Sequence, residues 1–463
     1  IAGAYAVISG LGVPSRRAVI MLLVAALSVA RRRQVDSVAV VALAAAVVLL
    51  VWLARRRDFR RRGVIGPARR LAVMQVFLMF GLLPLTALIF GRFAVLATPV
   101  NLVAVPVFSL LTVPMTIAAG AVGEISEALA LTLLRIAGLG IAVVESVIGF
   151  AVRGSHVDGS IAEIHGLAWL CLAMSLAWVL LPPAWPGRRV AVIGMMALLA
   201  WKSPPPPAAC LDSWILDVGQ GLAVVVRTAE DVTVYDTGMA WRSGGNAAQQ
   251  VILPFLASRG IEGITRLVVS HADLDHSGGA GTLLEHSAVG EVIAGEPLRG
   301  VRTSPCAKGQ GWSSGGIRFD FLHPGRQAGL DGTNASCVLR ASAGRHSLLL
   351  TGDIERQAER ALLATRTPLA ADVVVVPHHG SLTSSSPAFV DAVSPAIAVV
   401  SAGHANRWGF PVPQVVSRWQ TGGATIMNTA DEGAVFLRIC AAGGIVDVAS
   451  ERQRRRRFWH DER

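Results

Sequence analysis

The chain has 463 residues, of which 52% are hydrophobic and 16% are charged, and its formal net charge is +11. An average soluble protein carries about 25% charged residues, so this composition argues against a wholly soluble protein. Much of the arginine stands in clusters beside apolar runs. The positive charge therefore indicates membrane orientation first and an anionic ligand only second.

Residues 1–202 are almost continuously apolar and predict a polytopic α-helical membrane domain. A bilayer core requires about 20 apolar residues of helix. The candidate spans are 35–54, 71–90, 129–150 and 164–181, with 18–30 as the end of another and 190–202 as a short one. Residues 94–118 are also apolar, but their three prolines predict a broken or re-entrant helix. Because the chain starts at Ile1 with no signal peptide, we expect it to begin inside a longer protein.

Arginine clusters set the expected orientation. With the cluster at residues 55–70 in the cytoplasm, counting spans along the chain places the C-terminal half outside, in the periplasm of a Gram-negative cell. This count requires 94–118 and 190–202 each to cross once. Arg31 to Arg33 also precede span 35–54, and a single crossing cannot place both clusters inside. Either 35–54 does not cross or a second crossing is missing from this chain.

The C-terminal half begins after a proline-rich segment. Residues 203–209, SPPPPAA, predict a stiff linker, and residues 210–445 predict a separate α/β domain. The basic tail 446–463 is predicted to be solvated and disordered, with a nucleic-acid contact as the alternative. The five cysteines form no CxxC pair, which argues against a zinc–thiolate site, and in an oxidising compartment one or two disulfides of open pairing are expected.

Strands and helices alternate in this half. The predicted strands are 213–217, 222–227, 232–236, 266–270, 347–351, 372–376 and 396–401, and the predicted helices are 246–259, 277–287, 354–365 and 411–420. Several chemically active residues fall just after strands, where α/β folds build their sites.

The strongest chemical signal is the loop after strand 266–270, with the sequence HADLDH. It carries His271, Asp273, Asp275 and His276, four side chains able to bind a metal ion. Imidazole and carboxylate together suit Zn²⁺ or Mn²⁺. The alternative, an acidic solvated turn, is disfavoured because histidines flank the two aspartates.

Three weaker signals also stand at strand ends. They are Asp236 in the sequence YDTG, Asp353 in TGD, and the pair His378-His379 in PHHGS. Adjacent histidines after a strand point to opposite sides, so only one of the pair is expected to face a site. Taken singly, each signal is explained equally well by a structural turn.

In this order, the four signals resemble the metallo-β-lactamase superfamily. The resemblance implies an αββα sandwich with one or two divalent ions, Zn²⁺ or Mn²⁺, at the strand ends, and metal-assisted hydrolysis as the chemistry. The superfamily motif reads HxHxDH, and here its second histidine is replaced by Asp273.

The chain resembles the ComEC family of competence proteins more closely still. In the C-terminal half, the segments that show the resemblance are LDVGQG at 216–221, SHADLDHSGG at 270–279, TGD at 351–353, VPHHGS at 376–381, and Ser401 with Asn406-Arg407. In the membrane half they are NLVAVP at 101–106 and SRRAVIM at 15–21. The resemblance covers nearly the whole chain. It implies a polytopic membrane domain followed by a metallo-β-lactamase-like domain.

The sequence also departs from this family. The family's earlier N-terminal region is absent, and so is one crossing before residues 55–57. Leu222 replaces an aspartate found in many members, and Phe410 replaces the histidine of the NRYGHP motif. No central histidine ligand is evident, because His323 is expected to pack in the core.

The resemblance implies the roles of the site residues. The expected metal ligands are His271, Asp273, Asp275, His276, Asp353 as a bridge, and His378. Asp275, His378 and His379 are the candidate catalytic groups. Asp236 and Asp217 would support the site from behind, and Ser381 and Asn406 would contact a phosphate.

The implied function is DNA uptake across the inner membrane in natural transformation. The membrane domain would pass one strand irrespective of its sequence, and the outer domain would hydrolyse the other. The alternatives are a transport-only protein with a degenerate metal site and a membrane-anchored metallohydrolase of another ester. Since no P-loop is present, an ATP-driven motor would be a separate competence protein, and a homo-oligomer is a further expectation.

Overall fold

In the computed structural model, the described residues are 92–94, 97–153, 158–160, scattered positions between 171 and 194, 203–241, 244–325, 332–365 and 367–454. The chain divides into two compact units, residues 1–202 and 203–463. The predicted spans 18–30, 35–54 and 71–90 lie outside the described residues, and 164–181 and 190–202 lie largely outside them.

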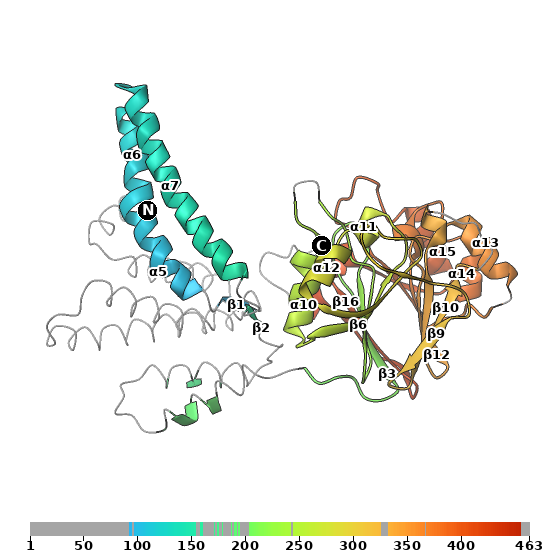
Figure 1. Ribbon diagram of the computed structural model, residues 1–463. Coiled ribbons are helices and arrows are strands. Elements are labelled where there is room, and N and C mark those ends of the chain that lie inside the picture. The colour runs from blue at the N-terminus through green and yellow to red at the C-terminus, as the bar shows by residue number, and fades with distance from the viewer. Residues whose placement is uncertain are drawn as a thin grey trace, which may run out of the picture. The chain divides into compact units, whose positions relative to one another are not determined.

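The first unit contains two long apolar helical segments (Figure 1). One is formed by α5 (Ala97–Val107), the π-helical turn η1 (Phe108–Thr112) and α6 (Val113–Val122), and the other by α7 (Glu127–Arg153). Within them, Pro99–Val122 and Glu127–Phe150 have 24 residues each and hydropathies of 2.1 and 1.9. Both are long and apolar enough to cross a membrane. A short antiparallel pair, β1 (Arg92–Ala94) with β2 (Asp158–Ser160), completes the described part.

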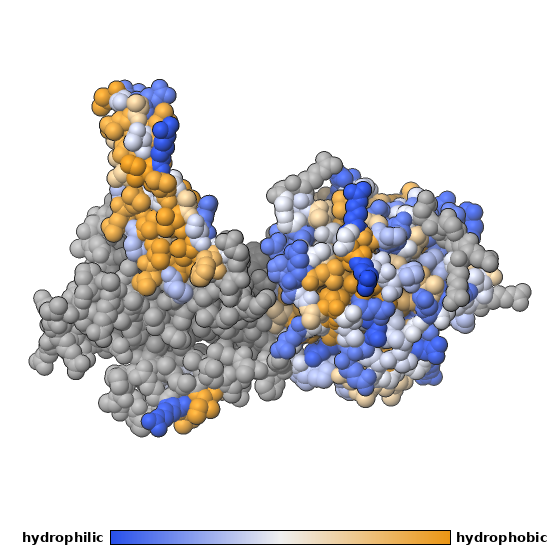
Figure 2. All heavy atoms as spheres, viewed as in Figure 1, coloured by the Kyte–Doolittle hydropathy of each residue, from blue (hydrophilic) through white to orange (hydrophobic). Residues whose placement is uncertain are grey.

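Residues 97–122 form a continuous helical run containing a π-helical turn, and not two separated pieces. Two prolines flank the π turn: Pro106 stands two residues before its first residue and Pro114 two residues after its last. Proline inside a helix removes a backbone hydrogen bond, and such local π adjustments accommodate the loss. Only 11% and 17% of the residues in the most apolar windows of the two segments are buried, and Figure 2 shows the apolar surface of this hairpin. A helix in a soluble core buries its apolar face, so these exposed faces fit a lipid environment better.

The second unit is an αββα sandwich of two sheets (Figure 1). The eight-stranded sheet has the order β17 (Gly444–Ser450), β16 (Val435–Cys440), β3 (Cys210–Ile215), β4 (Val224–Arg227), β5 (Val232–Tyr235), β6 (Gly263–Val269), β7 (Ala288–Ala294), β8 (Ser304–Pro305). The seven-stranded sheet has the order β15 (Thr425–Asn428), β14 (Ile397–Val400), β13 (Val373–Val375), β12 (His346–Leu350), β11 (Val338–Ala343), β10 (Ile317–His323), β9 (Gly311–Ser314).

Apolar side chains fill three layers of this sandwich. The layer between the sheets includes Tyr235, Phe319 and Leu350, all at most 1% exposed. One outer layer packs η2 (Ala248–Ile252), α10 (Leu253–Ser258) and α12 (Ala280–His286) on the eight-stranded sheet, and the other packs α13 (Arg356–Ala364), α14 (Pro387–Val393) and α15 (Pro413–Thr421) on the seven-stranded sheet. The predicted strands and helices of this half are all present within about three residues of their expected ends.

The folded unit continues beyond residue 445, where the sequence suggested a disordered tail. Strand β17 runs to Ser450 and pairs with β16, and α17 (Glu451–Arg454) follows it. Two arginines of the expected tail are anchored to the domain, because Arg452 donates to the carbonyl of Ala430 and Arg454 pairs with Asp447 at 3.0 Å. Residues 455–463 lie outside the described part.

Two disulfides tie the sandwich together. Cys210–Cys440 joins β3 to β16, the strands that bring the start and end of the domain together. Cys306–Cys337 links the segment after β8 to the segment before β11. Disulfides persist in oxidising compartments, so the pairing fits a domain outside the cytoplasm.

Candidate metal centre

The predicted site residues are brought to one edge of the sandwich by the strand order. Asp236 follows β5, and His271 follows the neighbouring parallel strand β6. Asp353 follows β12, and His379 follows its parallel neighbour β13. The carboxyl ends of parallel strands meet at one edge of a sheet. Asp236 and His379, which are 143 positions apart in sequence, therefore lie at the same edge of the sandwich.

Four side chains form a compact set of metal donors. Ligand atoms of Asp275, His276, Asp353 and His379 all lie within 4.8 Å of one another. His276 Nε2 is 3.2 Å from Asp353 Oδ1, and His379 Nε2 is 3.4 Å from Asp275 Oδ2 and 3.5 Å from Asp353 Oδ2. Imidazole nitrogens and carboxylate oxygens are the ligand types that suit a Zn²⁺ or Mn²⁺ ion. We call these four residues the primary donor set.

The charges within this set are strongly coupled. Burial alone would lower the pKa of His276, but the neighbouring carboxylates of Asp353 and Asp236 raise it well above its usual value. Burial would raise the pKa of Asp353, but His276 and His379 hold it well below its usual value. The carboxylates are thus anionic at neutral pH and lie within reach of a cation. Such perturbed groups, converging at strand ends, are typical of functional sites.

Residues behind the donors fix their orientation. The Asp236 carboxylate accepts hydrogen bonds from Ser270 N at 2.6 Å, from Ser270 Oγ at 2.8 Å and from His276 Nδ1 at 2.7 Å. His379 Nδ1 donates to the carbonyl of Ser401 at 2.7 Å. In both histidines Nδ1 is occupied and Nε2 is turned to the carboxylates, the arrangement that metal-binding histidines require. The sequence analysis did not predict these roles of Ser270 and Ser401, because the hydrogen bonds join segments that are distant in sequence. Their only signal in the sequence is their position beside or within the motifs.

His271 and Asp273 form a second, smaller group of donors beside the first. The rings of His271 and His276 lie 4.3 Å apart between centroids. His271 Nδ1 is bonded to Ser270 Oγ at 2.9 Å, but His271 Nε2 is buried and makes no hydrogen bond. Its neighbour is the carboxylate of Asp273, 3.3 Å away and 58% exposed. An imidazole nitrogen that faces a carboxylate oxygen at this distance also suits a metal ion.

The histidine pair lies in a tight turn, η4 (Pro377–Gly380), with both residues in the left-handed region, at φ 49° for His378 and 53° for His379. Such conformations cost energy and persist where the surroundings impose them. His379 is buried within the primary donor set. His378 stands at its edge, with Nε2 3.8 Å from Asp353 Oδ2, Nδ1 3.3 Å from Glu355 Oε1 and its side chain 22% exposed.

Three other predicted residues are engaged elsewhere in the described contacts. Asp217 accepts from Gly219 N and lies 3.8 Å from Arg452. The Asn406 amide closes its own loop by bonding Gly403 O and both polar backbone atoms of Phe410. Ser381 Oγ lies 3.0 Å from Thr383 Oγ1.

The segment GQG at 219–221 supports the centre through its backbone. Leu222 N donates to the carbonyl of Asp275 at 3.1 Å. Gly221 has φ of 120°, and a Cβ there would collide with that same carbonyl oxygen. A residue with a side chain would therefore displace Asp275 from the donor set.

Phe410, which replaces the family histidine, closes one side of the centre with an apolar ring. Its centroid lies 6.0 Å from that of His378 and 6.5 Å from that of His379. It supplies no donor, and its ring packs against the core beneath α14 and α15.

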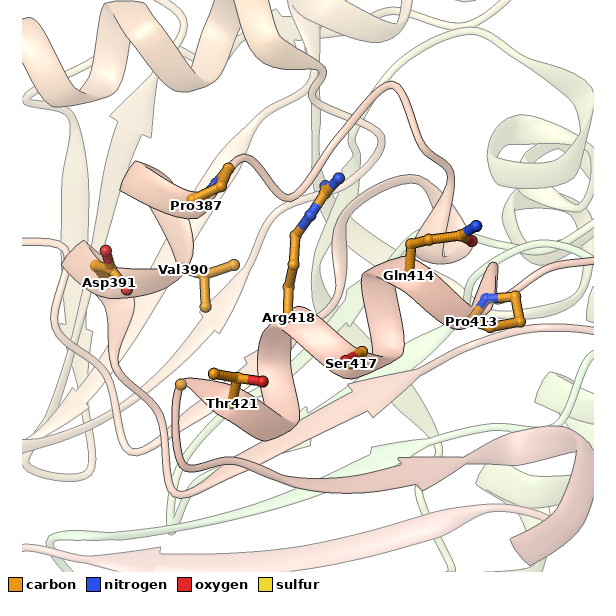
Figure 3. Close-up of a pocket in the computed structure, with 9 residues that line it drawn as sticks. Pro387, Val390, Asp391, Pro413, Gln414, Ser417, Arg418 and Thr421 are labelled. Carbon is orange, nitrogen blue, oxygen red and sulfur yellow. The ribbon is translucent and has the colours of Figure 1, made fainter.

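A separate groove of about 590 Å³ lies between α14 and α15 (Figure 3). Its lining includes Asp391, Gln414 and Arg418 and contains none of the predicted site residues. The chemistry of the domain is therefore assigned to the strand-end centre and not to this groove.

Fold and site together define the class. The sequence matches the metallo-beta-lactamase superfamily over residues 216–404, the stretch that holds the primary donor set. It matches the competence protein family over residues 1–52 and 46–186, in two pieces that meet where the charge pattern conflicts with a single crossing.

Three relatives align with about four fifths of the chain, across both matched regions. The chain is 32% identical to the uncharacterized protein YcaI of Escherichia coli, covering 81% of this chain and 50% of YcaI. It is 33% identical to the competence protein ComA of Neisseria gonorrhoeae, covering 81% and 52%, and 24% identical to the ComE operon protein 3 of Bacillus subtilis, covering 80% and 52%. The chain belongs to the ComEC family of competence proteins, and it spans about half the length of these three relatives.

Proposed function

We propose that this protein takes part in DNA uptake, with its C-terminal domain acting as a metal-dependent phosphodiesterase on the strand that is not transported. The observation that carries the proposal is the primary donor set, in which Asp275, His276, Asp353 and His379 converge within 4.8 Å at the edge of a metallo-β-lactamase sandwich. A divalent ion held there supplies Lewis acidity, which polarises a phosphoryl oxygen and lowers the pKa of a water molecule.

The surrounding residues have distinct tasks in this reaction. We assign Asp275 as the base that would accept the proton of the attacking water; its carboxylate is 25% exposed, the most open of the primary donor set. The water oxygen would form the new bond to phosphorus, and the bond to the sugar oxygen would break. We assign His378, whose side chain is 22% exposed beside Asp353, as the acid that would return a proton to that leaving oxygen.

Two features support the proposed location. The disulfides Cys210–Cys440 and Cys306–Cys337 favour an oxidising compartment, and the apolar segments Pro99–Val122 and Glu127–Phe150 favour a membrane. We propose a multi-pass inner-membrane protein with the hydrolase domain on the periplasmic side. The membrane domain would pass single-stranded DNA, and a separate ATP-driven motor and other competence proteins would be partners.

The second candidate is a transport-only protein. Phe410 favours it, because an apolar ring stands beside His378 and His379 where relatives supply an imidazole. In that case the outer domain would bind DNA or a partner without cleaving it.

The test is DNA degradation by the full chain in detergent, with end-labelled single- and double-stranded DNA and added Mn²⁺, Zn²⁺ or EDTA. Asp275→Asn should abolish degradation. The matched control is Asp372→Asn, because Asp372 also pairs with a histidine, His346 at 2.9 Å, but stands outside the centre. Metal-dependent cleavage that is lost only in Asp275→Asn supports the nuclease. If the folded chain degrades no DNA with either metal, the nuclease proposal is refuted and the transport-only function is supported.

A further inference from the structure

The loop after β14 carries a tryptophan on a fixed turn beside the centre. Gly409 N donates to the carbonyl of Asn406 at 3.1 Å, which closes a β-turn with Arg407 and Trp408 at its tip. The Asn406 side chain braces this turn by bonding both polar backbone atoms of Phe410. Trp408 therefore stands two positions before the ring that closes one side of the centre, on backbone that the Asn406 amide holds in place.

The indole of Trp408 contributes little to the packing of the domain. It is 44% exposed, and among the residues that form the three apolar layers of the sandwich it is not included. The guanidinium carbon of Arg407 lies 4.2 Å from the centroid of its ring. This cation–π contact holds the ring and adds a positive charge beside it, while much of the indole remains open to the solvent.

Two more apolar side chains are exposed on the loops of the centre. Leu274, which precedes Asp275, is 66% exposed, and Leu382, three positions after His379, is 44% exposed. We call Leu274, Leu382 and Trp408 the apolar rim. In the described part of the second unit, the large apolar side chains that are exposed are Leu274, Leu382, Trp408, Val446 and Val448. Single exposed apolar residues are ordinary, but three on the loops of one site indicate a binding surface.

Cationic groups accompany the apolar rim. Arg407 lies over Trp408, and Arg356 Nη2 donates to the carbonyl of Leu382 at 3.1 Å. Both arginines are exposed. Flat apolar surface beside guanidinium groups complements a ligand that has aromatic rings on an anionic backbone. An unpaired strand of nucleic acid has this chemistry, since each base presents a π-face and each phosphate a negative charge.

We propose that the apolar rim binds unpaired nucleobases next to the phosphodiester at the centre, with Trp408 as the residue on which a base stacks. The inference rests on the proposed function, because the strand must lie at the centre for its bases to reach the rim. Every base has a π-face, so this contact does not depend on sequence.

The rim also sets the order of events. In a duplex, each base is paired and stacked on its neighbours, so its face is not free for Trp408. The strand bound at the centre is therefore single, and its cleavage follows the separation of the two strands.

The experiment measures binding of labelled single strands to the full chain in detergent by fluorescence anisotropy. One strand is oligothymidylate, and the other has the same length and charge but abasic sugars. EDTA is present, so that metal-dependent cleavage does not occur. Repulsion from the metal-free carboxylates acts on both strands alike, and the ratio of the two Kd values therefore reports the bases.

Trp408→Ala should raise the Kd for oligothymidylate by about 5- to 150-fold, the usual effect of losing one stacking residue. The Kd for the abasic strand should stay the same. Trp408→Phe should recover most of the affinity, because phenylalanine keeps a π-face. The matched control is Val446→Ala, which removes an equally exposed apolar side chain from the edge strand β17 and should behave as wild type.

Unchanged binding of oligothymidylate by Trp408→Ala, or an equal loss for both strands, would overturn the inference. The readout does not depend on turnover. Base-dependent binding that requires Trp408, in a chain that degrades no DNA, would support this inference and refute the nuclease. Degradation of DNA by a chain whose binding does not depend on Trp408 would do the reverse.

Discussion

The substitution Asp236→Asn tests how much the Asp236 carboxylate, which lies behind the metal donors, contributes to metal affinity. Asp236 is fully buried and adopts φ of 59°, in which its two oxygens accept from Ser270 and His276. Asparagine has the same shape, so the backbone can remain in place. The amide nitrogen, however, cannot accept a hydrogen bond, and the negative charge that favours His276 Nδ1–H is lost.

We expect metal affinity to fall by about 10- to 100-fold, the usual cost of removing such an outer partner. That factor equals about 1.4 to 2.7 kcal/mol of binding free energy. Solvent does not screen the interaction between Asp236 and His276, because both side chains are 0% exposed. The effect should be larger for Zn²⁺ than for Ca²⁺, since only the former depends on imidazole.

The assay is chelator competition on the purified chain, with thermal unfolding recorded with and without metal. The control is Asp372→Asn, which removes a carboxylate that accepts from His346 Nδ1 and Ser347 N in the same pattern outside the centre. If Asp236→Asn binds Zn²⁺ as tightly as Asp372→Asn does, the carboxylate does not orient His276, and the reasoning fails.

Three further results are expected. First, neighbouring carboxylates raise the pKa values of His276 and His379 despite their burial, so protons compete with the metal and metal binding must release protons. Affinity should rise with pH by up to about tenfold per unit per proton, which calorimetry in buffers of different ionisation enthalpy would detect. The same groups stabilise the metal-free fold fully below their ordinary pKa of 6.5, so its unfolding temperature should fall as pH rises through the folded-state values; an unfolding temperature that rises instead would contradict the assignment. Second, replacing Cys210 and Cys440 together by serine should cost roughly 2–5 kcal/mol of unfolding free energy, measured by denaturant titration, and an unchanged midpoint would show the bond to be dispensable. Third, Phe410→Leu should preserve metal affinity while Phe410→His should increase it, because only the imidazole adds a donor beside His379; equal affinities in a chelator assay would exclude position 410 from the centre.

The break in the competence match bears on the membrane half. The two matched pieces, 1–52 and 46–186, meet within the stretch where arginines flank residues 35–54 on both sides. The two matches overlap at residues 46–52, inside this stretch. That one crossing is missing there stays a prediction from the charge pattern.

The sequence by itself determined the strands that carry the site, the main helices and the order of the chemical groups, but not the strands β7 to β11 and β15 to β17. Strands such as Val373–Val375 are short and wholly apolar, and helix α13 has a clear polar and apolar division, so local patterns were enough. The loop HADLDH predicted a metal site because four donor residues lie within six positions.

Local patterns failed where partners are distant in sequence. The edge strand β17 was missed because the prediction grouped residues 446–450 with the basic residues that follow them, although GIVDVAS has the β-branched residues of a strand and pairs with β16. The sequence also could not tell which of His378 and His379 faces the site. A turn in which both residues are left-handed decides that the His379 imidazole is the buried one.

Only the tertiary structure decided which of the candidate donors lie together. Asp275 and His276 follow Asp273 by two and three positions, yet they lie with Asp353 and His379 from the other sheet, whereas the exposed Asp273 lies beside His271. The physical reason is that parallel strands converge at one edge, so contacts are set by strand order across the sandwich and not by spacing along the chain.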